Sequence, residues 1–289
     1  MAIDINRNSG FTLPAEVAQE IIQKAQDASA VMQLATNVEL PSSGKAIPVI
    51  LGDADPEWIG ETDAAPVSDG SIGTRTMRPY KMAVIETFSD EFLRDLPKLY
   101  DAMISRTPGS IAKKFDATVN GAVAAPGSDF TQLSAATSAV DISSDAYNQL
   151  VTADGTIAAN GYAMNGIAVG AQGRSILLGA KDGQGRPLFT SGVEAGSVNP
   201  ILGAAVTVGR GVYAPGTPNV VGYAGDWSRA MVGTVAGIKV TPSTEGTVVK
   251  GAGDKAVTIS AYQNGLVFIK TEIELGFVAD TSAFVKLTD

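Results

Sequence analysis

The sequence contains neither cysteine nor histidine in its 289 residues. Their absence excludes disulfide scaffolds, thiol nucleophiles, zinc sites built on histidine or cysteine, and every catalytic arrangement in which histidine activates serine or cysteine. Carboxylate-based hydrolysis, Schiff-base chemistry at lysine and oxygen-ligated metal sites are the enzyme chemistries that remain. We therefore expect no enzyme here, with no catalytic, cofactor-binding or metal-binding residues.

Positive charge and long hydrophobic runs are also scarce. The 21 Lys and Arg residues oppose 30 Asp and Glu residues, which gives a formal charge of −9 and disfavours nonspecific adhesion to nucleic acid or to an anionic membrane. No apolar run approaches the roughly 18 residues of a membrane span, and residues 1–10 lack the apolar stretch of a signal peptide. We expect a protein that is first located in the cytoplasm and has no membrane partner.

The longest helical pattern lies at residues 96–122. One stripe of this helix is apolar and consists of Leu96, Leu99, Met103, Ile104, Ile111, Phe115, Val119 and Ala122. The opposite face is charged and carries Lys98, Asp101, Arg106, Lys113, Lys114 and Asp116. Pro108 and Gly109 interrupt the pattern, which allows either a kink or two helices. Because the stripe keeps its phase across the break, we favour a single kinked rod.

A helix from Pro14 to about Met32 and a long hairpin at residues 47–88 precede this rod. The ends of the hairpin alternate like strands, and its middle is rich in Gly, Asp and Ser. Acidic residues come before its tip and basic residues after it: Asp53, Asp55, Glu57, Glu61, Asp63 and Asp69, then Arg75, Arg78 and Lys81. Opposite charges that face each other across strands, or across two molecules, would help to fix the pairing.

Short strand and helix patterns separated by Gly and Pro turns make residues 141–255 an α/β lobe, in which Asp145 caps a helix that Asn160 and Gly161 end. Residues 267–277 alternate between apolar and mostly polar side chains, as a strand with one buried face does. We expect this strand to pack on the apolar stripe of the rod, so that the middle lobe is inserted into a discontinuous one.

One acidic segment imitates a calcium-binding loop. Asp53, Asp55 and Glu57 have the spacing of its first half, but Trp58 stands where the sharp turn needs Gly and Ala64 stands where the bidentate Glu belongs. We interpret this segment as a solvated acidic arm.

A glycine pair and a tryptophan also invite a functional interpretation. Gly209-Arg210-Gly211 begins like a dinucleotide-binding loop, but Ala214 replaces the third glycine and Pro215 would obstruct the helix that must follow. We predict a turn there. An aromatic residue such as Trp227 is more often a packing anchor than a platform for a ligand.

Several separated segments together resemble the major capsid protein family of tailed double-stranded DNA bacteriophages, which has the HK97 fold. The segments that carry the resemblance are Trp58-Ile59-Gly60-Glu61, Ser89-Asp90-Glu91-Phe92-Leu93, Lys114-Phe115-Asp116-Ala117, Lys181-Asp182-Gly183, Gly225-Asp226-Trp227 and Ala283-Phe284-Val285-Lys286-Leu287. They cover nearly the whole chain in the right order, which is more specific than any one of them.

The resemblance implies an α+β, HK97-like capsid fold. Its parts would be an N-terminal arm and helix (1–46), an extended β-hairpin loop (47–88), a peripheral domain with a spine helix (89–140 and 256–289) and an axial domain (141–255). The implied function is structural: self-assembly into hexamers and pentamers of an icosahedral shell that encloses phage double-stranded DNA. The implied locations are the virion and, before assembly, the host cytoplasm, with portal, scaffolding and decoration proteins as further partners.

The hairpin has too few large apolar residues to fold alone, which an interface between subunits would explain. We predict that this interface includes Trp58, Glu61, Asp63, Arg75, Arg78 and Lys81. The tip at 63–75 has no lysine, so the lysine-mediated cross-link of some family members is not expected. Two alternatives are an encapsulin, which forms the shell of a nanocompartment around an enzyme cargo, and a carboxylate-based hydrolase.

Overall fold

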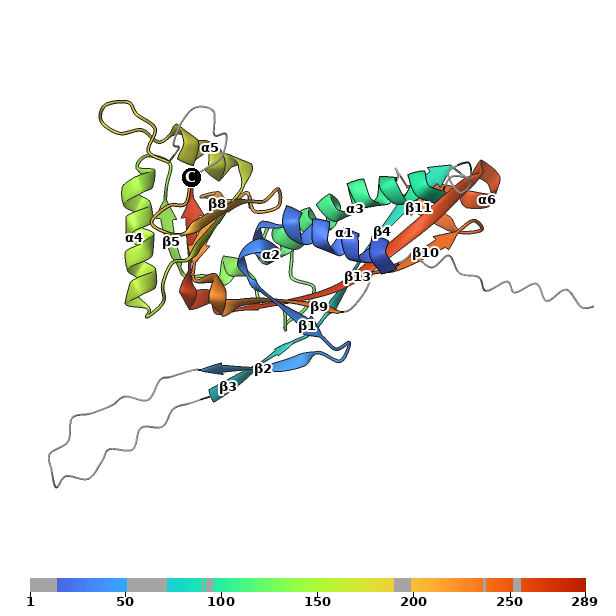
Figure 1. Cartoon of the computed structure of the whole chain (residues 1–289), viewed down its shortest axis with the longest axis horizontal. Helices are drawn as coiled ribbons and strands as arrows, with labels where there is room; N and C mark the ends of the chain where they lie inside the picture. Colours follow the sequence, from blue (N-terminus) through green and yellow to red (C-terminus); the bar gives the residue numbers. More distant parts are fainter. Residues whose placement is uncertain are drawn as a thin grey trace, which may run out of the picture.

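The computed structural model describes residues 15–50, 72–89, 91, 96–189, 199–235, 238–251 and 256–289. It consists of two lobes and a thin two-stranded finger that projects from them (Figure 1). The described part of the chain is elongated (Figure 1), and the mixture of helices and sheets confirms the α+β class.

The first lobe, which we call the spine lobe, is built on a five-stranded sheet. Its central strand β13 (Leu266–Ala279) pairs along one side with β4 (Tyr80–Ser89) and along the other with β9 (Ala230–Val235) and β10 (Lys239–Ser243), while β1 (Thr36–Leu40) pairs parallel with β9. Helices α1 (Ala15–Ala28) and α3 (Leu96–Val119) lie together beside this sheet (Figure 1).

Helix α3 runs unbroken through Pro108, which confirms the single rod. Of the predicted apolar stripe, Met103, Ile111, Phe115 and Val119 are buried in the core. Phe115 packs edge-on against Phe277 of β13, with ring centroids 6.3 Å apart, as expected for a strand packed on the rod. Ala122 lies beyond the end of the helix and is exposed.

The second lobe has its own sheet and its own apolar core. The strand order is β5 (Ser138–Asp141), β14 (Phe284–Thr288), β8 (Val220–Gly225), β6 (Gly166–Val169) and β7 (Ala205–Val208), with helices α4 (Ala146–Ala159) and α5 (Ala171–Gly179). Asp145 caps α4 by accepting a hydrogen bond from the backbone N–H of Asn148 at 3.3 Å. Asn160 and Gly161 follow its end, so the predicted helix is confirmed.

Smaller elements complete the described chain. The finger is β2 (Lys45–Ile50) with β3 (Ile72–Met77), and a short hairpin is formed by β11 (Thr247–Lys250) and β12 (Val257–Ser260). Helix α2 (Ala30–Leu34) follows α1, and α6 (Ala261–Asn264) precedes β13. Short 3-10 turns lie at Leu133–Ala135, Trp227–Arg229 and Thr281–Ala283.

The N-terminal helix pattern was predicted as one helix but forms two. Helix α1 ends at Ala28, and Ser29 adopts extended backbone angles as the N-cap of α2. A serine oxygen that accepts from the next turn competes with helix continuation. Strand β1, which follows α2, was not predicted.

Strand pairing also differs from the expected arrangement. The return arm of the predicted hairpin continues into β4, which pairs with β13 instead of the other arm. Strands β9 and β10, from the predicted insert, join the sheet of the spine lobe, and β14 joins that of the second lobe. Long-range pairing decided these positions, and local periodicity carries no information about the partner strand.

The expected polar face of β13 is largely covered. Phe268 and Glu272 are buried on it, whereas Lys270 is exposed. Both faces of this strand are therefore mostly buried, while β4, β9 and β10 pair with its two edges, so its fourteen residues form the centre of the lobe.

Candidate subunit interface

The finger leaves the body through a tight turn in which the Gly44 N–H donates to the Pro41 carbonyl oxygen at 2.9 Å. Gly44 has a φ of 84°, and a Cβ there would lie 2.8 Å from the carbonyl oxygen of Met77. Only glycine fits such a backbone conformation so close to another chain segment without strain.

An apolar cluster of Leu40, Met77 and Val278 holds the base of the finger. Met77 is fully buried. Strands β9 and β13 make room for it with glycine, because a Cβ at Gly233 would overlap Leu40 Cδ1 and one at Gly276 would lie 3.0 Å from Met77 Cγ. The finger is thus fixed to the sheet by side chains that fill the space above two glycines.

Of the predicted interface residues, Trp58, Glu61 and Asp63 lie outside the described residues, as does the calcium-like acidic segment. Arg75 lies on β3, and its Nη1 donates to the carbonyl oxygen of Ala279 at 2.6 Å. This contact ties the finger to the end of β13, so Arg75 has a role within its own chain.

Arg78 and Lys81 also contact their own chain but remain largely exposed. Arg78 Nε lies 3.3 Å from Asp129 Oδ2, with 63% of the arginine side chain exposed. Lys81 Nζ lies 3.8 Å from Glu274 Oε1 across the β4–β13 ladder. Exposed pairs of this kind contribute about 0 to 1 kcal/mol to folding, so both cations can still meet a partner molecule.

The two lobes meet at Asp116 of α3, which we call the lobe joint. Asp116 was predicted on the wet face of the rod, but it is completely buried. Its carboxylate accepts hydrogen bonds from Ser29 Oγ at 2.5 Å and from the backbone N–H groups of Ala30 at 3.1 Å and Val31 at 3.4 Å. Burial raises the pKa of Asp116 to about 6, although these hydrogen bonds lower it in part.

The turn after β7 closes the lobe joint from the second lobe. A Cβ at Gly209 would lie 2.7 Å from Asp116 Oδ2, and one at Gly211 would overlap the carbonyl oxygen of Lys113. The predicted turn is confirmed, and its glycines allow close approach to α3. The G-x-G spacing could have signalled such an approach, but nothing in the sequence marks Asp116 as buried.

Trp227 is a packing anchor, as predicted. Its side chain is buried, packs edge-on against Phe284 with ring centroids 5.1 Å apart, and donates from Nε1 to the carbonyl oxygen of Gly166 at 2.9 Å.

Strand β4 is an edge of the spine-lobe sheet, because no described strand pairs with its side away from β13. A groove of about 240 Å³ lies between β4 and α3 and is lined mainly by apolar residues, among them Met82, Val84 and Ile111. Free strand edges and apolar grooves favour association with another chain segment.

Large apolar side chains are also exposed at sites far apart in the molecule. Tyr147 and Val151 are exposed on α4, and Val249, Val257 and Tyr262 are exposed on β11, β12 and α6, elements that lie at the opposite end of the molecule (Figure 1). Tyr262 is 83% exposed. Several faces of the chain therefore present surface suited to contacts with other molecules.

Other kinds of site are not supported by the described residues. They contain no group of three or more Asp or Glu side chains placed to hold a metal ion. None of the described helices is long and apolar enough to cross a membrane.

Comparison with known proteins gives a consistent result. Residues 9–289 match the model of the phage capsid family. The chain is 31% identical to the probable major capsid protein gp17 of Mycobacterium phage L5 over 96% of this chain and 89% of that protein. Its fold is similar to a structure from Mycobacterium phage Adephagia, with 21% identity, a TM-score of 0.67 and 90% of each chain covered. A structure described as the capsid of an empty GTA particle has 16% identity and a TM-score of 0.62, over 90% of this chain and 89% of that one.

Proposed function

Because this chain belongs to the phage capsid family, in which it is a structural protein of the virion with the HK97-like fold, we propose that its copies gather as hexamers and pentamers in an icosahedral shell around double-stranded DNA. The observations that carry this proposal are the free edge of β4 with the apolar groove beside it and the exposed large apolar side chains at both ends of the molecule, because contacts between copies would bury such surface.

The parts of the chain receive the following roles. The finger, together with the residues between its strands, is the extended loop that overlaps a neighbour, and α3 is the spine helix. The spine lobe is the peripheral domain, and the second lobe is the axial domain that gathers around the symmetry axes. The strand pairing supports boundaries in which β4, β9 and β10 belong to the peripheral domain and β14 to the axial domain.

The proposed interface between copies includes Trp58, Glu61, Asp63, Arg78 and Lys81. Support comes from the two exposed cations near the finger, from the free edge of β4 and from the exposed apolar residues at both ends of the molecule. Arg75 contributes indirectly, because it fixes the finger to β13.

The protein has no catalytic role and binds no cofactor in this proposal. Copies are made in the host cytoplasm and assemble there, with portal, scaffolding and decoration proteins as partners. The absence of histidine and cysteine supports a purely structural role.

Microscopy of the purified protein tests the proposal. Negative-stain images and light scattering should show closed shells or capsomers. A protein that stays monomeric under all assembly conditions would contradict the proposal and favour the hydrolase alternative. Contents separate the two shell functions: DNA and a portal indicate a phage, whereas an enzyme cargo would indicate an encapsulin.

Charge reversal at Arg78 tests the interface. Arg78→Glu should change the free energy of unfolding by less than about 1 kcal/mol, because the pair with Asp129 is exposed. Assembly, measured as the fraction of protein in particles, should fall several-fold. Lys181→Glu makes the same change of charge on an exposed loop of the second lobe. Equal loss of folding and assembly in Arg78→Glu, or equal loss of assembly in the control, would argue against an interface role.

A further inference from the structure

An apolar groove follows the edge of β4 with which no described strand pairs, and it lies between this strand and α3. It consists of two adjoining hollows with volumes of about 240 and 150 Å³, and Met82 and Lys114 line both of them. Residues 82–84 of β4 line the larger hollow and residues 80–82 the smaller one, so the two centres lie about 7 Å apart along the strand. We call this feature the edge groove.

The edge groove ends at a carboxylate. Glu86 is the next residue of β4 that faces α3, and it accepts a hydrogen bond from Thr107 Oγ1 at 3.2 Å. None of the described Lys or Arg nitrogens lies within 4.0 Å of this carboxylate. At steps of two residues along β4, the groove therefore offers an apolar hollow, a second apolar hollow and an acceptor whose charge is not neutralised by an ion pair.

The N-terminal sequence has a pattern complementary to this groove. In residues 3–7 two isoleucines and an arginine follow one another at steps of two: Ile3, Ile5 and Arg7. In an extended segment these three side chains share one face, and Asp4 lies on the other. The segment thus presents two apolar side chains and a cation with the same spacing as the two hollows and the carboxylate.

The order of these groups fixes the direction of the segment. If it runs parallel to β4, the isoleucines enter the two hollows and Arg7 lies beside Glu86. Asp4 then lies on the exposed face of the sheet, where the side chain of Lys81 is 55% exposed. Opposite charges therefore meet on both faces of the added strand, which specifies its register.

Other segments outside the described residues match the groove less well. Neither 51–71 nor 190–198 contains a lysine or an arginine, and 51–71 contains two prolines, which lack the N–H that pairing with a strand edge needs. Phe11 and Leu13 repeat the apolar spacing, but the third position is Ala15, the first residue of α1. Residues 3–7 are thus the segment that supplies all three side chains.

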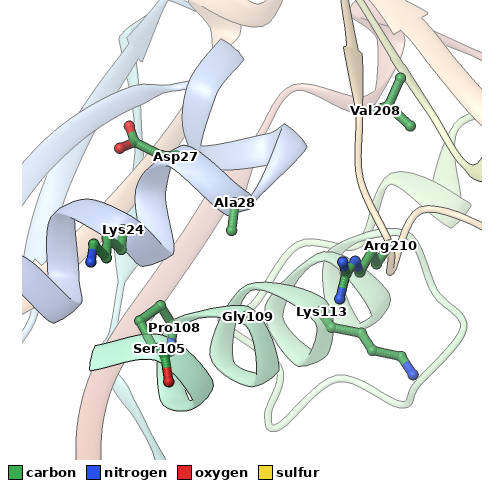
Figure 2. A pocket seen from close by; sticks show the side chains of 9 residues that line it. All are labelled: Lys24, Asp27, Ala28, Ser105, Pro108, Gly109, Lys113, Val208 and Arg210. Atoms are coloured by element: carbon green, nitrogen blue, oxygen red, sulfur yellow. The ribbon is translucent and has the colours of Figure 1, made fainter. Parts of the chain in front are cut away.

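Helix α1 and the edge groove lie on different sides of α3. Figure 2 shows the pocket between α1 and α3, which Gly109 and Lys113 of α3 line. Lys114 and Thr118 of α3 instead line the edge groove, and on a helix the row of Lys114 stands roughly 140° from the row of Gly109. The segment that precedes α1 would have to pass around α3 to enter the groove of its own chain, whereas a second copy needs no such path.

We propose that residues 3–7 of a second copy bind in the edge groove as a strand parallel to β4. The proposal rests on the proposed shell function and names one contact between its copies. Pairing along β4 would satisfy the N–H and C=O groups of its free edge, and the isoleucines would be buried between β4 and α3. The cost of ordering the segment offsets much of this gain, so the contact forms in the assembled protein and not with a free peptide.

Disulfide cross-linking tests the contact, because the chain has no cysteine of its own. One copy carries Asp4→Cys and the other, which has a tag that changes its size, carries Ala83→Cys on the exposed face of β4. Neighbouring strands are close enough for a disulfide between these two positions. The matched control replaces Ala83→Cys by Thr241→Cys, which is exposed on β10, the strand on the other side of β13.

The two copies are produced together, and the assembled protein is collected by sedimentation, oxidised and separated by denaturing electrophoresis without a reductant. The main cross-linked product should be the dimer of tagged and untagged copies, and the control should give little of it. Arg7→Glu in the copy with Asp4→Cys should lower the yield several-fold, and adding Glu86→Lys to the copy with Ala83→Cys should restore it. Thermal unfolding shows that each variant is folded.

Three results would overturn the proposal. One is an equal yield of mixed dimer in the control, since the segment would then lack a preferred site. Another is a disulfide within one chain when Asp4→Cys and Ala83→Cys are combined, seen as a monomer of changed mobility without dimer, because the chain would then fill its own groove. The third is an unchanged yield in Arg7→Glu. In each case, shells seen by microscopy of the same samples leave the proposed function standing.

Discussion

The lobe joint and the base of the finger connect parts of the same chain with opposite chemistry. At the lobe joint, the buried carboxylate of Asp116 accepts hydrogen bonds from Ser29, Ala30 and Val31. At the base of the finger, Leu40 and Met77 fill the space above two glycines, and the cluster is apolar. Both joints use glycine for close approach. The lobe joint depends on a charged group and its directed hydrogen bonds, whereas the base of the finger depends on side chains that fill space.

The lobe joint and the base of the finger should therefore differ in their response to pH and to substitution. Hydrogen bonds to a buried carboxylate fix the relative position of three elements and respond to pH, because burial disfavours the charged form. An apolar contact is insensitive to pH and tolerates substitutions that conserve volume. We therefore expect the two lobes to form a stiff unit, and the angle of the finger to be easier to change.

The largest effect is expected at the lobe joint. Gly211→Ala places a Cβ against the backbone of α3, at the carbonyl oxygen of Lys113, where no side chain can move aside. The free energy of unfolding should fall by at least about 3 kcal/mol. Gly155→Ala is the control, because nothing lies within 4 Å of its new Cβ inside α4, and it should stabilise by about 0.5 to 1 kcal/mol. Urea unfolding measures both, and a loss below about 1 kcal/mol in Gly211→Ala would mean that the turn can withdraw from α3.

The next effect concerns pH. The pKa of Asp116 is 3.8 in the unfolded reference and about 6 in the folded chain, mainly through burial. The folded state thus binds the proton more tightly, so this group stabilises the fold most below pH 4, and the stabilisation is lost as pH rises through 6. Asp116→Asn should remove this pH dependence, which amounts to roughly 2 to 3 kcal/mol of the free energy of unfolding.

Urea unfolding of the two proteins at pH 4, 5, 6 and 7 measures the difference. Titrations of the other carboxyl groups are common to both proteins and cancel when the curves are subtracted. Parallel stability curves would show that Asp116 does not titrate in this window and that the lobe joint is insensitive to pH.

Effects of similar or smaller size are expected at the base of the finger. Met77→Ala leaves a cavity next to Leu40 and should cost about 2 to 3 kcal/mol. Met77→Leu conserves volume and should cost less than about 1.5 kcal/mol. In the proposed shell the finger contacts neighbouring copies, so assembly of Met77→Ala should fall even where the subunit stays folded. Normal particle yield from folded Met77→Ala would show that the anchor is not needed for assembly.

Elements with a strong local pattern were predictable from the sequence. The period of the α3 stripe, the capping Asp145 and the alternation at β13 each depend on residues a few positions apart, so these elements lie where they were expected. The break at Ser29 was not predicted. Ser29 caps α2 by accepting from the Met32 N–H, and it also donates to Asp116, 87 residues away in the sequence, a contact that no local pattern shows. Among the candidate interface residues, the partners of Arg75, Arg78 and Lys81 were likewise hidden, since they lie on strands and loops distant in the chain.

The sequence by itself determined the family to which the chain belongs and the positions of its main helices and strands. Composition alone shows the lack of histidine and cysteine and the negative charge. Local spacing alone shows the order of the family segments. The tertiary structure alone decided which strands share a sheet, that Asp116 is buried and that Lys113 and Arg210 line one pocket. These features depend on contacts between segments far apart in the chain, and periodicity specifies which face of an element is buried but not what covers it.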